Sequence, residues 1–462
     1  MSTSKKLINL NRRQMLQGLL GGGAGLSALW GLGGSLHPFS PQARAAGSDL
    51  KDRNFIFCYF DGGWDGLLAL DPRDTALFSD DRVTETLINT GYGQLESTNE
   101  AGNNELISTS VDGMVFGPYI GKLADHADKL SVVRGMSMET LTHQVGYRRF
   151  LTGKPPSGLS ARGSSAATWL ASYLGEDALI ANLSVQVESY NADQPTFASA
   201  LKVGSVSDLI VALQAQETAL SPLAKRQIRS LLTQFGDCPR TSASPYFLRA
   251  LENKNRATSL VDENLDVYFD FQSSGMADIR SRYGIASNDN DLGSAGAQAA
   301  MAVQAISLGL TRCVSIRLGR SLDTHYDEWS TDQGPNQEEG FNLIATMLDD
   351  LEEEGLLEKT TIVAFSEFQR ASLLNATGGR DHSLTNSCLL VGGDIAGGKV
   401  IGRSSDVGME PTYTNLQTGE PDSSGEVVRP EHILRALFTS VGIEEDVADM
   451  RVEPLSALIR SE

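Results

Sequence analysis

The 462-residue sequence has little positive charge. Its 38 lysines and arginines are outnumbered by 58 aspartates and glutamates, which gives a formal net charge of -20. Nucleic acids and anionic membrane surfaces repel such a chain, so the composition argues against both as partners. An anionic substrate would need local positive charge or a metal ion to hold it.

Cysteine is also scarce, with only four residues in the chain. Cys58, Cys313 and Cys388 lie in apolar, strand-like runs, where a buried free thiol is the commoner state. We therefore expect no disulfide framework, even in an oxidising compartment.

Long apolar segments are missing beyond the N-terminal region. No later run reaches eighteen uninterrupted apolar residues, so no stable membrane span is expected in the mature protein. The first 45 residues resemble an export signal, because basic residues that include Arg12 and Arg13 precede the run LLGGGAGLSALWGLGGSL, and Ala43–Ala45 supply a small-x-small cleavage site. The arginine pair in NRRQML resembles the twin-arginine type. An uncleaved membrane anchor is the alternative, which the weak, glycine-rich run disfavours.

This reading predicts a periplasmic or secreted protein and the twin-arginine translocase as its partner during export. That route carries folded proteins, often with a metal or cofactor already inserted.

Apolar runs of strand length occur at 54–60, 130–133, 313–318, 360–365 and 387–391. They are nearly continuous rather than alternating, as expected for strands that are covered on both faces. A helical pattern over 338–355 has apolar residues at Phe341, Ile344, Leu348 and Leu351. Strands separated by helices predict a three-layer αβα fold with a mostly parallel central sheet.

The chain divides into four expected segments. Residues 1–45 are the signal peptide, 46–204 and 311–462 form two parts of the α/β core, and 205–310 read as a helical insertion in or on that core. The insertion includes a helix that begins at Ser221-Pro222 and ends before Gly236. The polar segment 403–428 predicts a long surface loop.

Candidate site residues follow the strands, because sites in parallel α/β sheets gather at the carboxyl ends of strands. Asp61 and Asp65 follow the first strand, Asp323 and His325 follow the run at 313–318, and the run at 360–365 leads to Glu367. The remaining candidates are Asp381 and His382 in the glycine-rich stretch GGRDHS, and Thr142 and His143 after the run at 130–133. Carboxylate oxygens and imidazole nitrogens that converge from separate strands are typical of a divalent-metal site. A structural or surface histidine is the alternative at each single position.

These motifs together resemble the alkaline phosphatase and sulfatase superfamily, and more narrowly the exported proteins of domain-of-unknown-function family 1501. The resemblance rests on the arginine-pair signal, GGWDGL, THQVGYRRFLTG, DTH, SEFQR, GGRDHS and GGDIAGGKVIG. It spans nearly all of the mature chain and is weakest over the helical middle.

The resemblance implies one or two divalent metal ions (zinc, calcium, magnesium or manganese) that bind ester oxygens and activate a nucleophile at a helix N-terminus. It places Asp61, or its competitor Asp65, at the acid that ends the first strand. Asp381 and His382 match the Asp-His metal pair, and Asp323 and His325 match the second Asp and His ligands. Thr142 or His143 lies near the nucleophile's position, although Thr142 could equally be a helix N-cap.

Arginines near these candidates could contact an anionic group. Arg380, beside the Asp-His pair, is expected to orient a phosphate or sulfate. For Arg148 and Arg149 a solvated helix face is the alternative.

The sequence also departs from the superfamily. It has no Cys-x-Pro-x-Arg, which argues against formylglycine chemistry, and Glu367 stands where sulfatases carry a ligand aspartate, so Glu367 and Asp381 compete for one role. The last histidine, His432, is expected in a C-terminal helix. The predicted function is a metal-dependent hydrolase of phosphate or sulfate esters, acting on an anionic small molecule or polysaccharide. The alternative is a non-catalytic exported binding or assembly protein on the same scaffold.

Overall fold

The computed structural model describes residues 52–214, 223, 226–227, 230 and 265–460. The expected signal peptide and most of the expected helix over 221–236 lie outside the described residues. Residues 46–462 belong to one compact unit.

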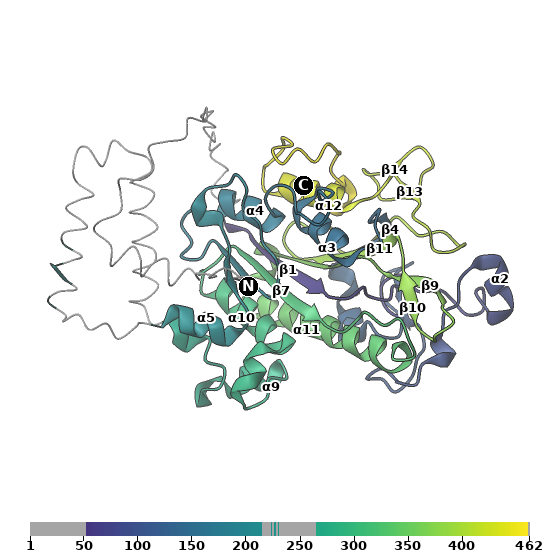
Figure 1. Cartoon of the computed structure of the whole chain (residues 1–462), viewed down its shortest axis with the longest axis horizontal. Helices are drawn as coiled ribbons and strands as arrows, with labels where there is room; N and C mark the ends of the chain where they lie inside the picture. Colours follow the sequence, from purple (N-terminus) through teal and green to yellow (C-terminus); the bar gives the residue numbers. More distant parts are fainter. Residues whose placement is uncertain (1–51, 215–222, 224–225, 228–229, 231–264, 461–462) are drawn as a thin grey trace, which may run out of the picture. The chain divides into compact units, whose positions relative to one another are not determined.

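An eight-stranded sheet forms the centre of this unit (Figure 1). Its strands, in spatial order, are β12 (Lys399–Ile401), β4 (Leu130–Ser137), β11 (Thr385–Val391), β8 (Thr360–Ser366), β1 (Asn54–Phe60), β7 (Cys313–Gly319), β5 (Asn182–Val185) and β6 (Leu201–Val203). All five predicted strands are present, and β5, β6 and β12 are additional.

All neighbouring strands of the sheet are parallel except at β11, which runs antiparallel to both β4 and β8. The reason lies in the connection from β8. The chain leaves β8 through a short antiparallel pair, β9 (Arg370–Leu374) and β10 (Arg380–His382), and enters β11 without a crossover helix. A strand that follows such a direct return is antiparallel to the strand it left. The predicted mostly parallel sheet is confirmed.

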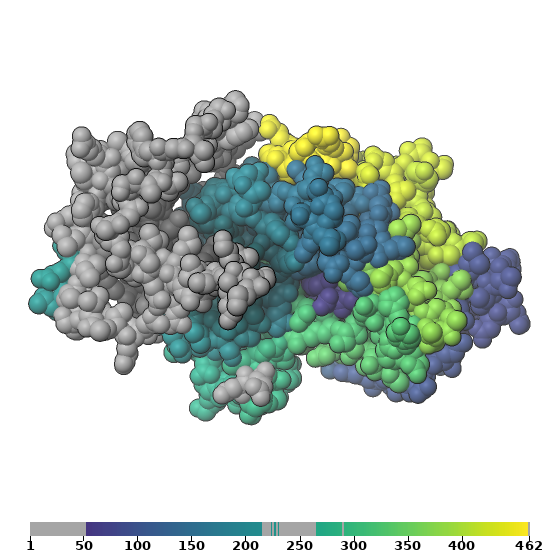
Figure 2. All heavy atoms as spheres, in the orientation of Figure 1, coloured from purple at the N-terminus to yellow at the C-terminus, as the bar shows by residue number. Residues whose placement is uncertain are grey.

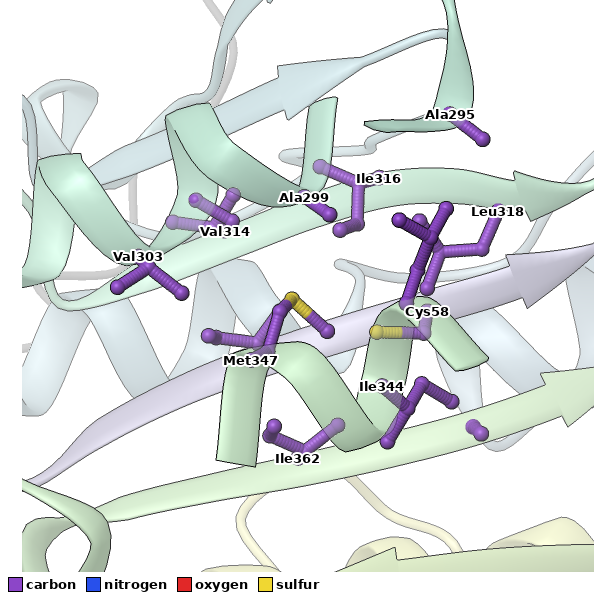
Figure 3. Packing of buried hydrophobic residues seen from close by; sticks show 14 of the residues in the cluster. Cys58, Ala295, Ala299, Val303, Val314, Ile316, Leu318, Ile344, Met347 and Ile362 are labelled. Atoms are coloured by element: carbon purple, nitrogen blue, oxygen red, sulfur yellow. The ribbon is translucent and has the colours of Figure 1, made fainter. Parts of the chain in front are cut away.

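Helices cover both faces of the sheet. Alternate residues of β1 enter two separate cores, with Ile56 and Cys58 in one and Phe55 and Phe57 in the other, because successive side chains of a strand point to opposite faces. The first core is shared with α10 (Ala295–Ser307) and α11 (Gly334–Glu353), as Figure 3 shows for Val303 and Met347. The second is shared with α3 (His143–Thr152), α4 (Ala166–Leu174) and α12 (Pro430–Ser440). This arrangement is the predicted three-layer αβα fold.

Within the segment 205–310, α10 packs against β7 and α11, so this helix belongs to a layer of the core. The other described α-helices are α2 (Val83–Thr86), α5 (Val206–Leu213) and α9 (Ala277–Arg282). The other short strands are β2 (Ile107–Ser108), β3 (Val115–Phe116), β13 (Tyr413–Thr414) and β14 (Glu426–Val427). The last two lie in the segment 403–428, which the sequence presents as a loop.

Three of the four cysteines, Cys58, Cys313 and Cys388, are buried and free, as expected from their apolar runs. Cys238 lies outside the described residues. Burial raises the pKa of each of the three described thiols. In the described part of the chain, no helix has the length and apolar character of a membrane span.

Candidate metal centre

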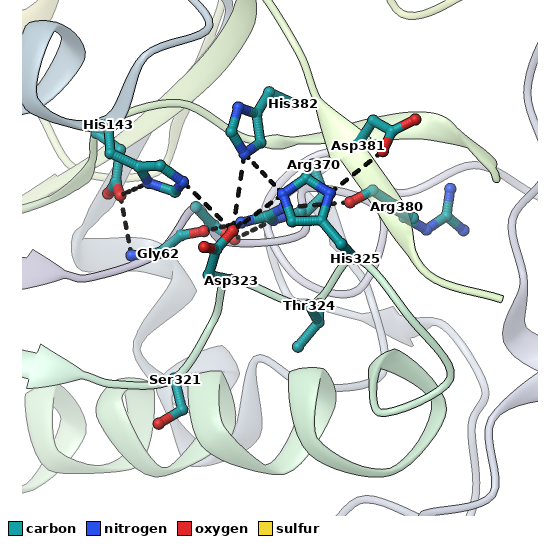
Figure 4. A network of polar contacts seen from close by, with 12 residues as sticks. Gly62, His143, Ser321, Asp323, Thr324, His325, Arg370, Arg380, Asp381 and His382 are labelled. Carbon is teal, nitrogen blue, oxygen red and sulfur yellow. Dashed lines mark hydrogen bonds and ion pairs between the residues drawn. The ribbon is translucent and has the colours of Figure 1, made fainter. Parts of the chain in front are cut away.

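Four side chains from three segments of the chain meet near the carboxyl ends of the central strands. His143 begins α3 after β4, Asp323 and His325 follow β7, and His382 ends β10. Their rings surround Asp323 in Figure 4. We call these four residues the histidine cluster.

Asp323 is the centre of this cluster. Its Oδ1 atom lies 3.3 Å from His143 Nε2, 3.1 Å from His325 Nε2 and 3.7 Å from His382 Nε2. The Nε2 atoms of His325 and His382 are 2.9 Å apart. Donor atoms of His143, Asp323 and His382 all lie within 4.8 Å of one another, a spacing that can accommodate a metal ion.

A second set of contacts holds the outer nitrogen of each imidazole. His143 Nδ1 lies 2.7 Å from Glu367 Oε1, His325 Nδ1 lies 3.2 Å from Asp381 Oδ1, and His382 Nδ1 lies 2.6 Å from the carbonyl oxygen of Leu141. Glu367 also accepts from the backbone nitrogen of Gly62 at 3.0 Å. The Nδ1 atom of each imidazole is therefore hydrogen-bonded to a group outside the cluster.

Arg370 lies beneath the cluster with a side chain that is fully buried. Its Nη2 donates to Asp323 Oδ1 at 2.6 Å, and its Nη1 is 3.2 Å from His325 Nε2. The same guanidinium donates to the backbone carbonyls of Gly62, Gly63 and Arg380. A buried arginine needs such a full set of acceptors, since the cost of an unpaired buried charge is high.

These contacts shift several pKa values. Burial alone would lower the pKa of His143, but the hydrogen bond and charge of Glu367 and the charge of Asp323 raise it. Burial lowers the pKa of His382, and the nearby charge of Arg370 lowers it further. Burial would raise the pKa of Asp323, but its hydrogen bond with Arg370 brings it below the usual range. The hydrogen bond from Asn375 is the main cause of a lowered pKa at Asp381.

The cluster is partly exposed to solvent. The side chains of Asp323 and Asp381 are 53% and 65% exposed, while those of His143, His325 and His382 are 19–31% exposed and Glu367 is buried. In the space-filling view, a small purple patch from the first described residues is visible between the blue and green segments (Figure 2). A small molecule in solution can therefore reach the carboxylates of Asp323 and Asp381.

Close backbone contacts bring the loops together. A Cβ atom at Gly146 in the first turns of α3 would lie 2.2 Å from the carbonyl oxygen of Glu367, so only glycine lets α3 approach the end of β8 this closely. At Gly379 a Cβ atom would lie 2.3 Å from the carbonyl carbon of His325. Both glycines serve the contact between neighbouring loops.

Asp381 and His382 belong to the short strand β10, which differs from the bent loop that the glycine-rich stretch predicts. Adjacent residues of a regular strand point to opposite faces. The register of β10 against β9 is irregular between Arg380 and His382, and both Asp381 and His382 contact His325. Asp381 and His382 thus both reach His325 from an irregular strand, whereas the sequence predicts that a loop brings them together.

Asp61 and Asp65 lie apart from the cluster's contacts. Asp61 binds Arg317 Nη1 at 2.9 Å and accepts from the Tyr59 hydroxyl at 3.1 Å. Asp65 is buried, accepts from Trp329 Nε1 at 2.8 Å and pairs with Arg380 Nε at 2.9 Å. Their carboxylates are engaged by arginines, so the structure provides a structural role for both.

Arg380 is also placed differently from the expectation. Its side chain is completely buried, pairs with Asp65 and lies over the Trp329 ring, while Nη1 and Nη2 donate to backbone carbonyls. The expected role of Arg380 in orienting a substrate stays a prediction, and in this structure its guanidinium has no exposed surface. It stabilises the fold around the β1 loop.

Three further residues singled out in the sequence lie in or beside helices. Thr142 is exposed and occupies the N-cap position of α3, but its side chain makes no capping hydrogen bond. His432 is buried in the first turn of α12, where its Nδ1 accepts from the backbone nitrogen of Arg429 at 3.0 Å, as expected for a helix residue. Arg149 is buried against Glu431, so the alternative of a solvated helix face does not hold for this residue.

Sequence reasoning missed two contributors to the centre. Arg370 ends the motif SEFQR, in which the sequence assigns no role to the arginine; its position four residues after β8 is the available signal. The carbonyl of Leu141 carries no sequence signal, because any residue supplies a backbone carbonyl.

Solved structures with a similar arrangement have low similarity scores. Ps i-CgsB in complex with k-i-k-neocarrahexaose is 8% identical with a TM-score of 0.39, covering 88% of this chain and 75% of that chain. The PsFucS1 sulfatase from Pseudoalteromonas sp. is 12% identical with a TM-score of 0.37, covering 88% and 72%. The lipoteichoic acid synthase LtaP from Listeria monocytogenes is 9% identical with a TM-score of 0.36, covering 89% and 77%. Values this low carry no argument about activity.

Comparison with curated proteins found no match. The family model DUF1501, described as a protein of unknown function, matches residues 52–419. Since this range covers most of the sequence, including the whole histidine cluster, the chain belongs to the DUF1501 family.

Proposed function

We propose that this protein is an exported, metal-dependent hydrolase of phosphate or sulfate esters. The observation that carries the proposal is the convergence of three imidazole nitrogens and one carboxylate oxygen at the solvent-facing carboxyl edge of a mostly parallel sheet. Nitrogen and oxygen donors in such a group fit a divalent ion.

The negative charge around the cluster indicates that an anionic substrate would need a metal ion in order to bind there. Asp323, Asp381 and Glu367 contribute carboxylates, and Arg370, the arginine that contacts the cluster, has no exposed side-chain surface. An anionic ester that approached this edge would meet exposed carboxylates and be repelled. A bound divalent cation would offset that charge and polarise the ester oxygens.

The chain supplies a candidate nucleophile beside this centre. Thr142 lies between Leu141, whose carbonyl binds His382, and His143. Its hydroxyl is not used to cap α3, and the N-terminus of a helix favours negative charge. In the proposed step Thr142 Oγ attacks phosphorus or sulfur, the bond to the alcohol oxygen breaks, and the alcohol leaves with a proton. Water then hydrolyses the threonine ester and releases phosphate or sulfate.

A second function is favoured by the burial of Arg370 and Arg380. Neither guanidinium is exposed to bind an anionic group. A non-catalytic exported protein that binds or assembles with a partner through the same scaffold agrees with this observation.

An assay on the purified protein separates the two functions. We expect turnover of an aryl phosphate or an aryl sulfate that disappears after chelation, returns with added metal, and is lost in Thr142→Val and His382→Ala. His126→Ala, a histidine in the 3-10 segment Gly121–Lys129 outside the cluster, should retain turnover. Protein that binds metal but turns over neither ester would contradict the hydrolase and favour the binding protein.

A further inference from the structure

We infer that a single ion of the zinc class is held by the Nε2 atoms of His143, His325 and His382 together with Asp323. Glu367 and Asp381 then orient imidazoles and do not bind the ion. This inference rests on the proposed function for the presence of a metal, and it replaces the seven-residue ligand set expected from the sequence with four donors.

The outer contacts determine which ring nitrogen carries hydrogen. A carbonyl oxygen only accepts, so His382 must donate from Nδ1 to Leu141 at 2.6 Å. Carboxylates likewise accept, so His143 donates from Nδ1 to Glu367 and His325 donates from Nδ1 to Asp381. In a neutral imidazole the other nitrogen is then an acceptor, and in all three rings it is Nε2 that faces Asp323.

Four acceptors therefore point at one another. Lone pairs on the Nε2 atoms of His325 and His382 cannot form a hydrogen bond across their 2.9 Å separation, and neither can form one to the Asp323 carboxylate. Arg370 supplies a donor to Asp323 and lies close to His325 Nε2, and a shared cation would satisfy the lone pairs that remain on His143 and His382. Outer hydrogen bonds from Nδ1 to a carboxylate or a backbone carbonyl are also the usual way in which proteins orient metal-binding histidines.

Four of the six separations between these donor atoms are close to those of one coordination sphere. Donors that bind one ion tetrahedrally at 2.0–2.1 Å lie about 3.3 Å apart along each edge. The distances here are 2.9 Å between His325 and His382, and 3.1, 3.3 and 3.7 Å from the three Nε2 atoms to Asp323 Oδ1. These four distances lie on either side of the ideal edge. His325 is outside the group of donors that all lie within 4.8 Å of one another, so its ring would have to move toward His143 to complete the set of four ligands.

The donor types select the class of ion. Three imidazoles and one carboxylate suit zinc and its neighbours among the divalent transition metals. Calcium and magnesium prefer oxygen ligands, and the available carboxylates of Glu367 and Asp381 are engaged by imidazoles. The calcium and magnesium in the range expected from the sequence are thus disfavoured.

Arg370 distinguishes His325 from the other two histidines. Its Nη1 lies 3.2 Å from His325 Nε2, and three backbone carbonyls hold the guanidinium in place. The arginine competes with the ion for this one lone pair. His325 should therefore contribute least to affinity among the three histidines.

The first test uses the intact protein and needs no substitution. We expect nitrogen-15 histidine spectra of the metal-free protein to show Nδ1-protonated rings for the three cluster histidines, and their Nε2 signals to move when Zn²⁺ is added. His126 and His432 serve as internal references. Unmoved Nε2 signals in the cluster on saturation with Zn²⁺ would overturn the inference.

The second test compares two groups of variants with Co²⁺ as a spectroscopic probe. His143→Ala, His382→Ala and Asp323→Ala should abolish stoichiometric binding or change the Co²⁺ absorption spectrum, with His325→Ala showing the mildest loss of affinity. Glu367→Gln and Asp381→Asn keep an oxygen acceptor for Nδ1, so they should weaken affinity by about 10–100-fold or less and leave the saturated spectrum unchanged. His126→Ala should match the wild type.

Two results would assign the ligands differently. A changed spectrum in Glu367→Gln or Asp381→Asn would make that carboxylate a ligand, and stronger binding of Ca²⁺ than of Zn²⁺ in competition would reject the ion class. Thermal melts of each variant identify loss of fold, and the exposed Asp381 provides a variant that should fold regardless. Ester turnover is measured separately, so stoichiometric Zn²⁺ without turnover would reject the hydrolase and leave the ligand assignment standing.

Discussion

Several of the buried ionisable side chains in the described residues are paired with an opposite charge. Asp65 pairs with Arg380, and Arg149 pairs with Glu431. The guanidinium of Arg370 similarly binds Asp323 at the edge of the cluster. Removing one member of such a pair leaves a buried charge, which costs several kcal/mol. Glu338 in α11 lacks a close cation and therefore behaves differently.

Glu338 predicts a specific pH dependence of stability. Its side chain is 6% exposed, its carboxylate accepts from the backbone nitrogen of Glu100 at 3.3 Å, and burial raises its pKa from 4.5 to about 7. The folded state thus binds more protons than the unfolded state between these pH values, and stability falls as the pH rises from about 4.5 to 7. Between pH 4.5 and pH 8, this titration should lower the free energy of unfolding of the wild type by an amount on the order of 2–3 kcal/mol. Glu338→Gln should lack this part of the pH dependence.

Urea unfolding of the wild type and Glu338→Gln at both pH values measures this difference. The neighbouring exposed residue supplies the control, because Glu339→Gln removes the same charge without removing a buried carboxyl. If the pH dependence of Glu338→Gln equals that of the wild type, Glu338 does not titrate as proposed.

At the scale of elements, the connection between β4 and α3 positions two parts of the centre, the Leu141 carbonyl and His143. Glu139 in this connection has a left-handed backbone with φ of 52°. Arg149 Nη1 lies 2.7 Å from Glu139 and also donates to the Met138 carbonyl, while its Nη2 reaches Glu431 of α12 at 2.7 Å. An ion-pair network across two helices therefore holds a strained connection against the metal centre.

The strain at Glu139 can be separated from its ion pair by two substitutions. Glu139→Ala loses the ion pair and keeps a Cβ atom in the left-handed region, whereas Glu139→Gly loses the pair and relieves the backbone. We expect the glycine variant to have a free energy of unfolding about 1 kcal/mol higher than the alanine variant. Denaturant unfolding of both against the wild type measures this, and equal stability would show that the connection changes conformation once the pair is lost.

At the scale of the whole molecule, the compact unit of residues 46–462 carries the proposed chemistry, and export is proposed for the sequence before it. Only Arg12 and Arg13 form an arginine pair ahead of the apolar run. If they address the chain to the twin-arginine translocase, Arg12→Lys with Arg13→Lys should leave uncleaved precursor in the cytoplasm. Immunoblots of cell fractions measure the distribution, with Lys5→Arg and Lys6→Arg as the charge-preserving control. Normal export of the double arginine variant would reject the twin-arginine route.

The three-layer fold could be predicted from sequence because its strands are buried on both faces. Runs such as 54–60 and 360–365 are apolar throughout, and this pattern is a local property. The direction of β11 was not predicted, since it depends on the β9–β10 pair that replaces a crossover helix. The edge strands β5, β6 and β12 are short and lack the same continuous apolar signal.

The sequence by itself determined which residue types the centre contains. Aspartates and histidines placed just after strands must gather at one edge of a parallel sheet, and this accounts for Asp323, His325 and His382. Only the tertiary structure decided what each residue contacts, because the role of a carboxylate depends on which side chain the fold places beside it. Arg317 engages Asp61, Arg380 engages Asp65, and the imidazoles engage Glu367 and Asp381. These partners are 56 to 315 residues apart in the sequence, and no local pattern in the chain records such distant contacts.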